Sequence, residues 1–143
     1  MKFVKNRHMP LAIFREHETT LSLLSPGATR FATNFIMVER FVKAKRGLQQ
    51  MVIDPRWDVY VAELRVSRDR ETNRRARDVK RLINDDRLWT SCNNFVHLVW
   101  PVVVALREFD GKKPCTDKAY KVMKNLEKHI IQLKDALFRF QVS

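Results

Sequence analysis

The sequence predicts an all-α fold: a single-domain, irregular bundle of about five to six helices. Two observations favour it. First, the 143 residues include only 3 glycines and 5 prolines, which leaves long stretches free of helix breakers. Second, apolar residues recur three and four positions apart, the spacing of one helical face. With 45% hydrophobic and 31% charged residues, the chain has the composition of a globular protein of one domain, residues 1–143.

The first segment, residues 1–24, is expected to be helical with an interruption. Pro10 lacks a backbone donor and fits the first turn of a new helix. Thr19 and Thr20 weaken the helix beyond it, which allows a short extended segment near residues 21–24. Residues 25–27 then read as a turn.

A second helix is expected over residues 29–52, where the apolar stripe has one gap at Lys45. Thr29 is a candidate N-cap for it. Asp54 and Pro55 should end this helix and open the next as N-cap and first residue, with that helix reaching about Leu64. Residues 65–71 are polar and are expected to form a loop.

Three further segments complete the bundle. A helix is expected over residues 72–84. The most apolar one follows over residues 85–109 and is expected to lie at the centre of the bundle. After a loop at residues 110–114, a last helix should span about residues 117–140.

The net charge of +12 favours a polyanionic partner, nucleic acid before membrane. Four arginines lie at i, i+4, i+7 and i+11 on one helical face and could follow phosphates. The alternative is a solvated face, because four acids are interleaved with them: Asp69, Glu71, Asp78 and Asp85. The candidate DNA-binding arginines of this face are Arg70, Arg74, Arg77 and Arg81. Two further basic clusters are Lys43, Lys45 and Arg46, and Lys118, Lys121, Lys124 and Lys128.

Arg30 and Phe31 stand at the start of the second expected helix. Phe31 can be a core residue that begins the apolar stripe. It can also stack on an unpaired base while Arg30 holds a phosphate. The pattern leaves both readings open.

No motif for catalysis, metal or cofactor binding is found in the sequence. Cys92 and Cys115 are far apart, which argues against a zinc site, and their number suggests a reducing compartment. No glycine-rich phosphate loop is present. The longest apolar run, residues 95–106, is too short and interrupted to span a bilayer. We therefore expect no cofactor, no metal, no small-molecule ligand and no membrane partner.

Several stretches, taken together, resemble plant hAT-superfamily transposases and their domesticated relatives. They are LLSPGATRFATNFIMVERFVKAKRGLQQMVI (residues 23–53), Asp-Pro-Arg-Trp (54–57), DVKRLINDDRLW (78–89), WPVVVALREFDGKKPC (100–115) and Tyr120. The resemblance implies an RNase H-like nuclease domain interrupted by a helical insertion, which cuts DNA with three acidic residues and divalent metal. This chain would hold the end of the first catalytic half and the start of the insertion.

On that resemblance, no position here matches a catalytic acid, so the chain is expected not to be an enzyme by itself. It implies a nuclear, truncated, transposase-derived protein that at most binds DNA non-specifically, with Arg30 and Phe31 matching a family position implicated in handling a flipped base. Association with a full-length transposase or self-association is a further expectation. The alternative is a protein-interaction module or a degenerate remnant, whose Phe3, Val4, Leu11 and Phe14 would be exposed for lack of their sheet.

Overall fold

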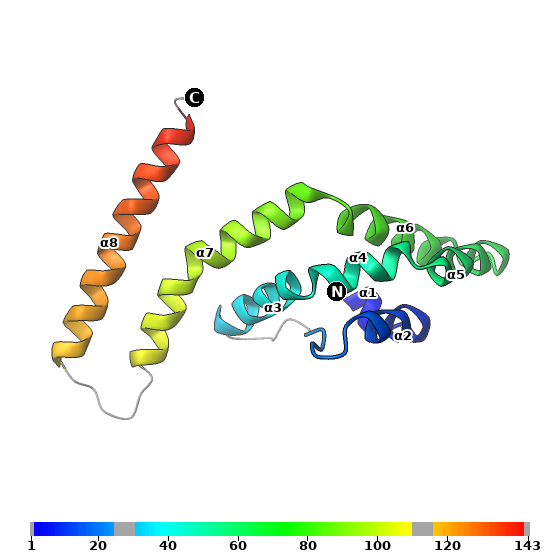
Figure 1. The fold of residues 1–143 in the computed structure, drawn as a ribbon, viewed down its shortest axis with the longest axis horizontal. Coiled ribbons are helices and arrows are strands. Elements are labelled where there is room, and N and C mark those ends of the chain that lie inside the picture. The colour runs from blue at the N-terminus through cyan, green and yellow to red at the C-terminus, as the bar shows by residue number, and fades with distance from the viewer. Residues whose placement is uncertain (1, 25–30, 110–115, 142–143) are drawn as a thin grey trace. The chain divides into compact units, whose positions relative to one another are not determined.

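The computed structural model describes residues 2–24, 31–109 and 116–141, and within helices it leaves the side chains of residues 31–32, 108–109, 116–119 and 133–141 undescribed. The described chain is all-α, as the sequence predicted, and contains no strand (Figure 1). Residues 21–24 are in neither a helix nor a strand. The helices are α1 (Lys2–Lys5), α2 (His8–His17), α3 (Phe31–Lys43), α4 (Lys45–Ile53), α5 (Pro55–Val66), α6 (Arg70–Ile83), α7 (Asp86–Phe109) and α8 (Thr116–Gln141).

The chain divides into two compact units, residues 1–93 and residues 94–143. The first unit holds α1 to α6 and the start of α7, and the second holds the rest of α7 and α8. The expectation of a single domain stays a prediction.

The core of the first unit forms where α2 packs on α4. Phe14 of α2 and Leu48 of α4 are both 1% exposed, and Trp57 of α5 joins the same cluster fully buried. Gly47 makes the close approach possible. A Cβ atom at this position would lie 2.6 Å from the Cβ of Glu18, where α2 ends.

The first segment corrects one expectation. Val4 and Phe14 are each 1% exposed, and Phe3 and Leu11 pack partly buried against the same core. The idea that these residues would be exposed for lack of a sheet is therefore wrong. Helices of the first unit cover them instead. Pro10 lies in the first turn of α2, as predicted.

Residues 31–53 form two helices rather than one. Ala44 separates α3 from α4, with φ −82° and ψ 5°, and is fully buried. The gap in the apolar stripe at Lys45 falls at this break, so the gap was the sequence mark of an interruption. The expected Thr29 cap and the turn at residues 25–27 lie outside the described residues, as does the loop at residues 110–114.

The α5–α6 hairpin follows the sequence closely. Asp54 caps α5 by accepting a hydrogen bond from the Arg56 backbone N–H at 2.9 Å, and Pro55 is the first helical residue, as predicted. The expected loop over residues 65–71 is shorter. It spans three residues, because Asp69 caps α6 by accepting from the Thr72 backbone N–H at 3.0 Å.

Helix α7 has almost the predicted bounds. Its Trp89 is 1% exposed, stacks on Phe41 with ring centroids 4.7 Å apart and donates to the Ile83 carbonyl at 2.7 Å. Further along, Leu98 and Trp100 are 46% and 44% exposed. Val99 and Val103 of the same half are 8% and 0% exposed, so this half has one buried and one exposed face, and the expectation that the helix forms the centre of a bundle stays a prediction. Helix α8 closely matches the predicted last helix.

Candidate nucleic-acid interface

The outer face of α6 carries the predicted row of arginines. Thr72, Asn73, Ala76 and Ile83 point inward and are buried, so residues at the complementary positions must face solvent. The row is exposed, as a helical face of this spacing requires: Arg70, Arg74, Arg77 and Arg81.

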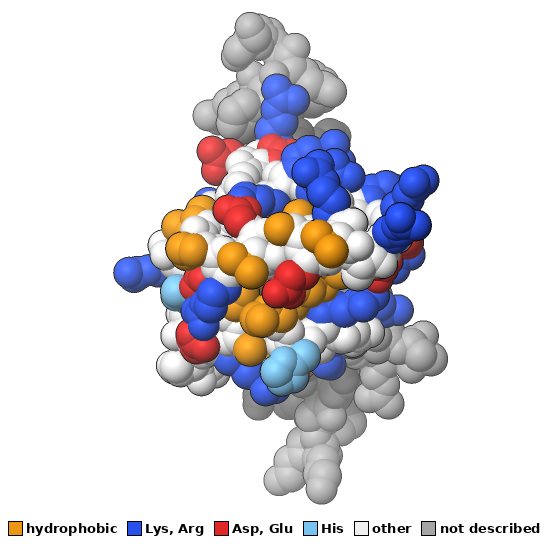
Figure 2. Space-filling view, turned by 90° about the vertical axis from the view of Figure 1, so that its right-hand side faces the viewer, with side chains coloured by type: hydrophobic (Ala, Val, Ile, Leu, Met, Phe, Trp, Pro, Cys, Tyr) orange, Lys and Arg blue, Asp and Glu red, His pale blue; other side chains and the backbone are white. Residues whose placement is uncertain are grey.

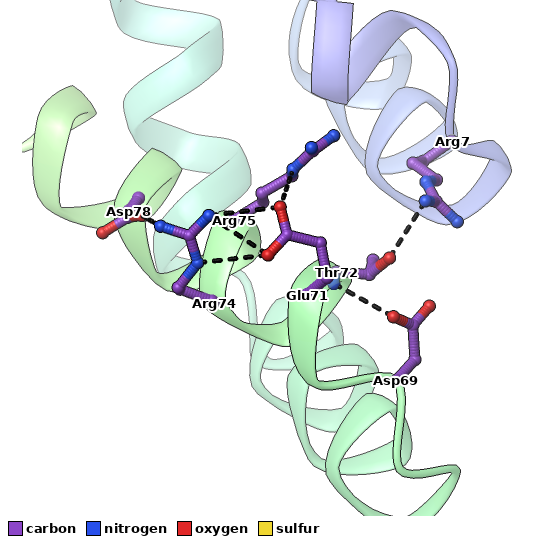
Figure 3. A network of polar contacts seen from close by, with 7 residues as sticks. All are labelled: Arg7, Asp69, Glu71, Thr72, Arg74, Arg75 and Asp78. Atoms are coloured by element: carbon purple, nitrogen blue, oxygen red, sulfur yellow. Dashed lines mark hydrogen bonds and ion pairs between the residues drawn. The ribbon is translucent and has the colours of Figure 1, made fainter.

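Carboxylates on the same helix hold part of this row. Glu71 accepts hydrogen bonds from Arg74 Nε at 3.2 Å and from Arg75 Nε at 2.7 Å (Figure 3). Asp78 lies 3.2 Å from Arg81 Nη2. The hydrogen bonds from Arg75 and Arg74 hold the pKa of the Glu71 carboxyl below its usual range. In the free protein, Arg74 and Arg81 therefore fit the alternative of a solvated face.

The remaining arginines of the row belong to a different arrangement. Arg70 and Arg77 line a hollow of about 630 Å³ between the end of α5 and the first half of α6. Among the described residues, no carboxylate lines it. We call it the arginine hollow, and its lining is Leu64, Arg65, Arg68, Arg70, Asn73, Arg74 and Arg77. Figure 2 faces this end of the first unit and shows Lys and Arg side chains gathered on one part of it.

Four of the five arginines in the arginine hollow are not neutralised. Within the described chain, no carboxylate lies within ion-pair distance of these four side chains, whereas Arg74 contacts two acids. Like charges that line one hollow repel one another, and an anion that binds between them stabilises the folded protein. The four are Arg65, Arg68, Arg70 and Arg77.

The α5–α6 hairpin fixes the geometry of the hollow. Asn73, at its floor, donates from Nδ2 to the Val61 carbonyl at 2.8 Å and so ties α6 to α5. Arg7 donates to Thr72 Oγ1 at 3.0 Å and holds the start of α6 against the first segment (Figure 3). Arg68 has φ 58°, the left-handed region, and is the one non-glycine residue with positive φ in the described chain.

Arg65 and Arg68 were not among the predicted site residues. Both were assigned to a polar loop, and neither shares a helical face with the α6 row. The signal was present as the run Arg65, Arg68, Arg70 around a helix–helix turn, but only the closure of the hairpin brings this run beside Arg77.

The second predicted basic cluster does not converge. Lys43 pairs with Glu39 at 2.6 Å, whereas Lys45 lies 5.4 Å from the Trp89 ring centroid, a cation–π contact. Arg46 is exposed and has no ion pair with any described residue.

The third predicted cluster is spread along α8. Lys124 lies 5.1 Å from the centroid of the Tyr120 ring. Lys121 and Lys128 are exposed. The Lys118 side chain lies outside the described residues.

Arg30 also lies outside the described residues, and Phe31 is described only as the first residue of α3. Their roles, as core or as contacts to an unpaired base, stay predictions.

Among the described residues, no group of three or more His, Cys, Asp or Glu side chains could hold a metal ion. No helix in these ranges is long and apolar enough to cross a membrane. Cys92 is a free thiol whose pKa is raised by burial.

Comparisons with protein-family models, with curated proteins and with solved structures found nothing that matches this chain.

Proposed function

We propose that this protein binds DNA non-specifically through its phosphates, with the arginine hollow as the principal contact. The observation that carries the proposal is a hollow lined by five arginines, with no carboxylate among the described residues of its lining. The guanidinium fork matches phosphate oxygens in two-pronged hydrogen bonds, and it stays charged at every physiological pH.

Two features favour a non-specific mode. The hollow offers cations and one amide, and the amide of Asn73 is already engaged with the Val61 carbonyl. Phosphate contacts set position and affinity, whereas sequence is read by groups that reach base edges. The resemblance to hAT-superfamily transposases makes DNA the expected polymer. As part of the same proposal, the chain is a transposase-derived, nuclear fragment with no catalytic acids of its own.

Fluorescence anisotropy with a labelled 20-base-pair duplex across a salt series tests the proposal. Each neutralised phosphate contributes about −0.9 to the slope of log affinity against log salt. Replacing Arg65, Arg68 and Arg70 together by alanine should lower the affinity. It should also make the slope less steep by the contribution of about two phosphate contacts or more.

A matched control removes three exposed positive charges elsewhere: Arg46, Lys121 and Lys128 to alanine. It should change affinity much less, because these side chains lie on α4 and α8 and are not part of the lining of the arginine hollow. Equal losses in both triple variants would reassign binding to net charge alone. No salt-dependent binding by the native chain would refute the proposal, provided circular dichroism shows the expected helices.

A second candidate function is protein interaction, and one observation favours it. Large apolar side chains are exposed on both helices of the second unit: Leu98 (46%), Trp100 (44%), Leu106 (45%), Met123 (58%), Ile130 (58%) and Ile131 (52%). Exposed apolar groups in this number favour association with another surface. Light scattering after size-exclusion chromatography distinguishes the cases, since a monomer over the whole concentration range would speak against self-association.

A further inference from the structure

The five arginines of the hollow are not equivalent. Four of them have no carboxylate partner among the described residues, whereas Arg74 contacts two acids on its own helix. Figure 3 shows its guanidinium between Glu71 and Asp78, in line along α6. Arg74 therefore belongs at once to the lining of the hollow and to an internal ion-pair chain.

Glu71 is the stronger of the two partners. Its carboxylate accepts from Arg74 Nη2 at 3.1 Å and from Arg74 Nε at 3.2 Å, whereas Asp78 lies 4.0 Å from Arg74 Nη1. The two contacts to Glu71 occupy the Nε–Nη2 edge, one of the two edges through which a guanidinium can bind a phosphate. A phosphate can therefore use this edge of Arg74 only by displacing Glu71.

A phosphate can displace Glu71 from Arg74 because this ion pair is exposed to solvent. The side chains of Arg74 and Glu71 are 63% and 53% exposed, and exposed ion pairs contribute little to stability. A phosphate in the hollow would meet several other guanidinium groups in addition to Arg74. When Arg74 turns to the phosphate, Glu71 still keeps its 2.7 Å contact with Arg75, so the carboxylate is not left alone.

We infer that Arg74 is the fifth phosphate ligand of the arginine hollow and that Glu71 withholds it in the free protein, setting the affinity for nucleic acid. This inference rests on the proposed function, because it names a residue that tunes that same site. The ligand class is the phosphodiester backbone of DNA. Glu71 is a positioning residue, since it acts through Arg74 and does not contact the ligand.

The test is a set of single and double variants, whose affinity for the labelled duplex is measured by anisotropy across a salt series. Glu71→Gln keeps the size of the side chain and removes the charge that competes. It should raise the affinity at low salt about threefold or more and steepen the salt slope by about 0.9, one additional phosphate. Glu127→Gln, an exposed glutamate of α8, changes the net charge equally and should leave the slope unchanged.

Two arginine variants distinguish release of Arg74 from the general effect of removing one negative charge. The gain from Glu71→Gln should vanish in an Arg74→Ala background and persist in an Arg75→Ala background. A gain that persists without Arg74 would overturn the inference, since removing one acid would then be enough by itself. Another outcome is that Glu71→Gln gives no gain in any background, while the native chain binds DNA and the Arg65, Arg68, Arg70 triple variant binds it more weakly. That result would overturn the inference and leave the proposed function standing. Absence of binding by the native chain would overturn both.

Discussion

Gly47 is the residue at which two helices of the first unit come closest. A Cβ atom added there would lie 2.6 Å from the Glu18 Cβ and 3.3 Å from Phe14 Cε2. Glycine inside a helix weakens it by about 1 kcal/mol relative to alanine, so this position gives up helix propensity for a close contact. Single residues of this kind decide the packing, and sequence pattern alone does not reveal which glycine has such a neighbour.

Gly47→Ala should therefore destabilise the protein, although the same change in an open helix would stabilise it. The clash with a backbone-near atom is expected to cost about 1–3 kcal/mol, more than the gain of about 1 kcal/mol in helix propensity. Chemical denaturation measures the change. Gln50→Ala, exposed on the same helix, is the control and should be neutral or mildly stabilising. Rescue by a second change, Glu18→Gly, would confirm the contact, and a Gly47→Ala protein as stable as the native one would contradict it.

Asp54 caps α5 and also contacts the side chains of Arg56 and His17. Its carboxylate lies 2.8 Å from Arg56 Nη2 and 3.0 Å from His17 Nε2, and these hydrogen bonds, that of Arg56 first, hold its pKa well below the usual range. A lowered pKa in the folded state means that the carboxylate stabilises the protein above its ordinary pKa. That contribution is lost as the pH falls through the lowered value.

Asp54→Asn isolates this charge, because asparagine caps a helix about as well as aspartate. At pH 7 the variant should melt below the native protein. The gap between the melting temperatures should narrow as the pH falls below the ordinary aspartate pKa of about 3.9. Thermal melts followed by circular dichroism at several pH values between 7 and 2 measure it. A gap that stays constant over this range would show that the carboxylate charge has no part in it.

At the scale of elements, the sequence predicted helices well and their junctions less well. The Asp54–Pro55 junction carries its signal locally, as a capping side chain and a fixed backbone angle, and the structure confirms it. The break at the buried residue Ala44 left only one gap in an apolar stripe as its signal in the sequence. The arginine hollow could be predicted only for its α6 row, because the closure of a hairpin has no local signal.

The α5–α6 turn makes the next prediction. Arg68 holds φ 58°, which costs a non-glycine residue about 1–2 kcal/mol. Arg68→Gly should recover about 1 kcal/mol of this in the free energy of unfolding, while Arg68→Ala keeps the unfavourable angle and recovers none. Both variants should bind the DNA duplex more weakly, since both remove a guanidinium from the hollow. Chemical denaturation of the two variants measures the backbone effect, and anisotropy measures the side-chain effect. Equal stability of the two variants would contradict the predicted cost of the positive φ angle.

At the scale of the whole molecule, the positive charge has two opposite consequences. With a net charge of +12, the positive side chains of the folded chain repel one another, and salt screens that repulsion. The same charge attracts DNA, and salt weakens that attraction. The exposed ion pairs on α6 are worth about 0–1 kcal/mol each and are screened too, so their loss is a smaller effect than relief of the net repulsion.

The free protein should therefore melt at a higher temperature as sodium chloride rises from about 20 to 200 mM, within the range where screening changes most. The complex with DNA should show the reverse, because bound ligand stabilises the folded chain by mass action and the affinity falls with salt. The two melting curves should thus converge as salt increases. The Arg65, Arg68, Arg70 triple variant provides the control: its free form should gain less from salt, and DNA should raise its melting temperature less at low salt. Differential scanning fluorimetry with and without duplex measures all four series. A free protein destabilised by salt would mean that attractive pairs outweigh the net repulsion, and a DNA effect independent of salt would rule out binding through phosphates.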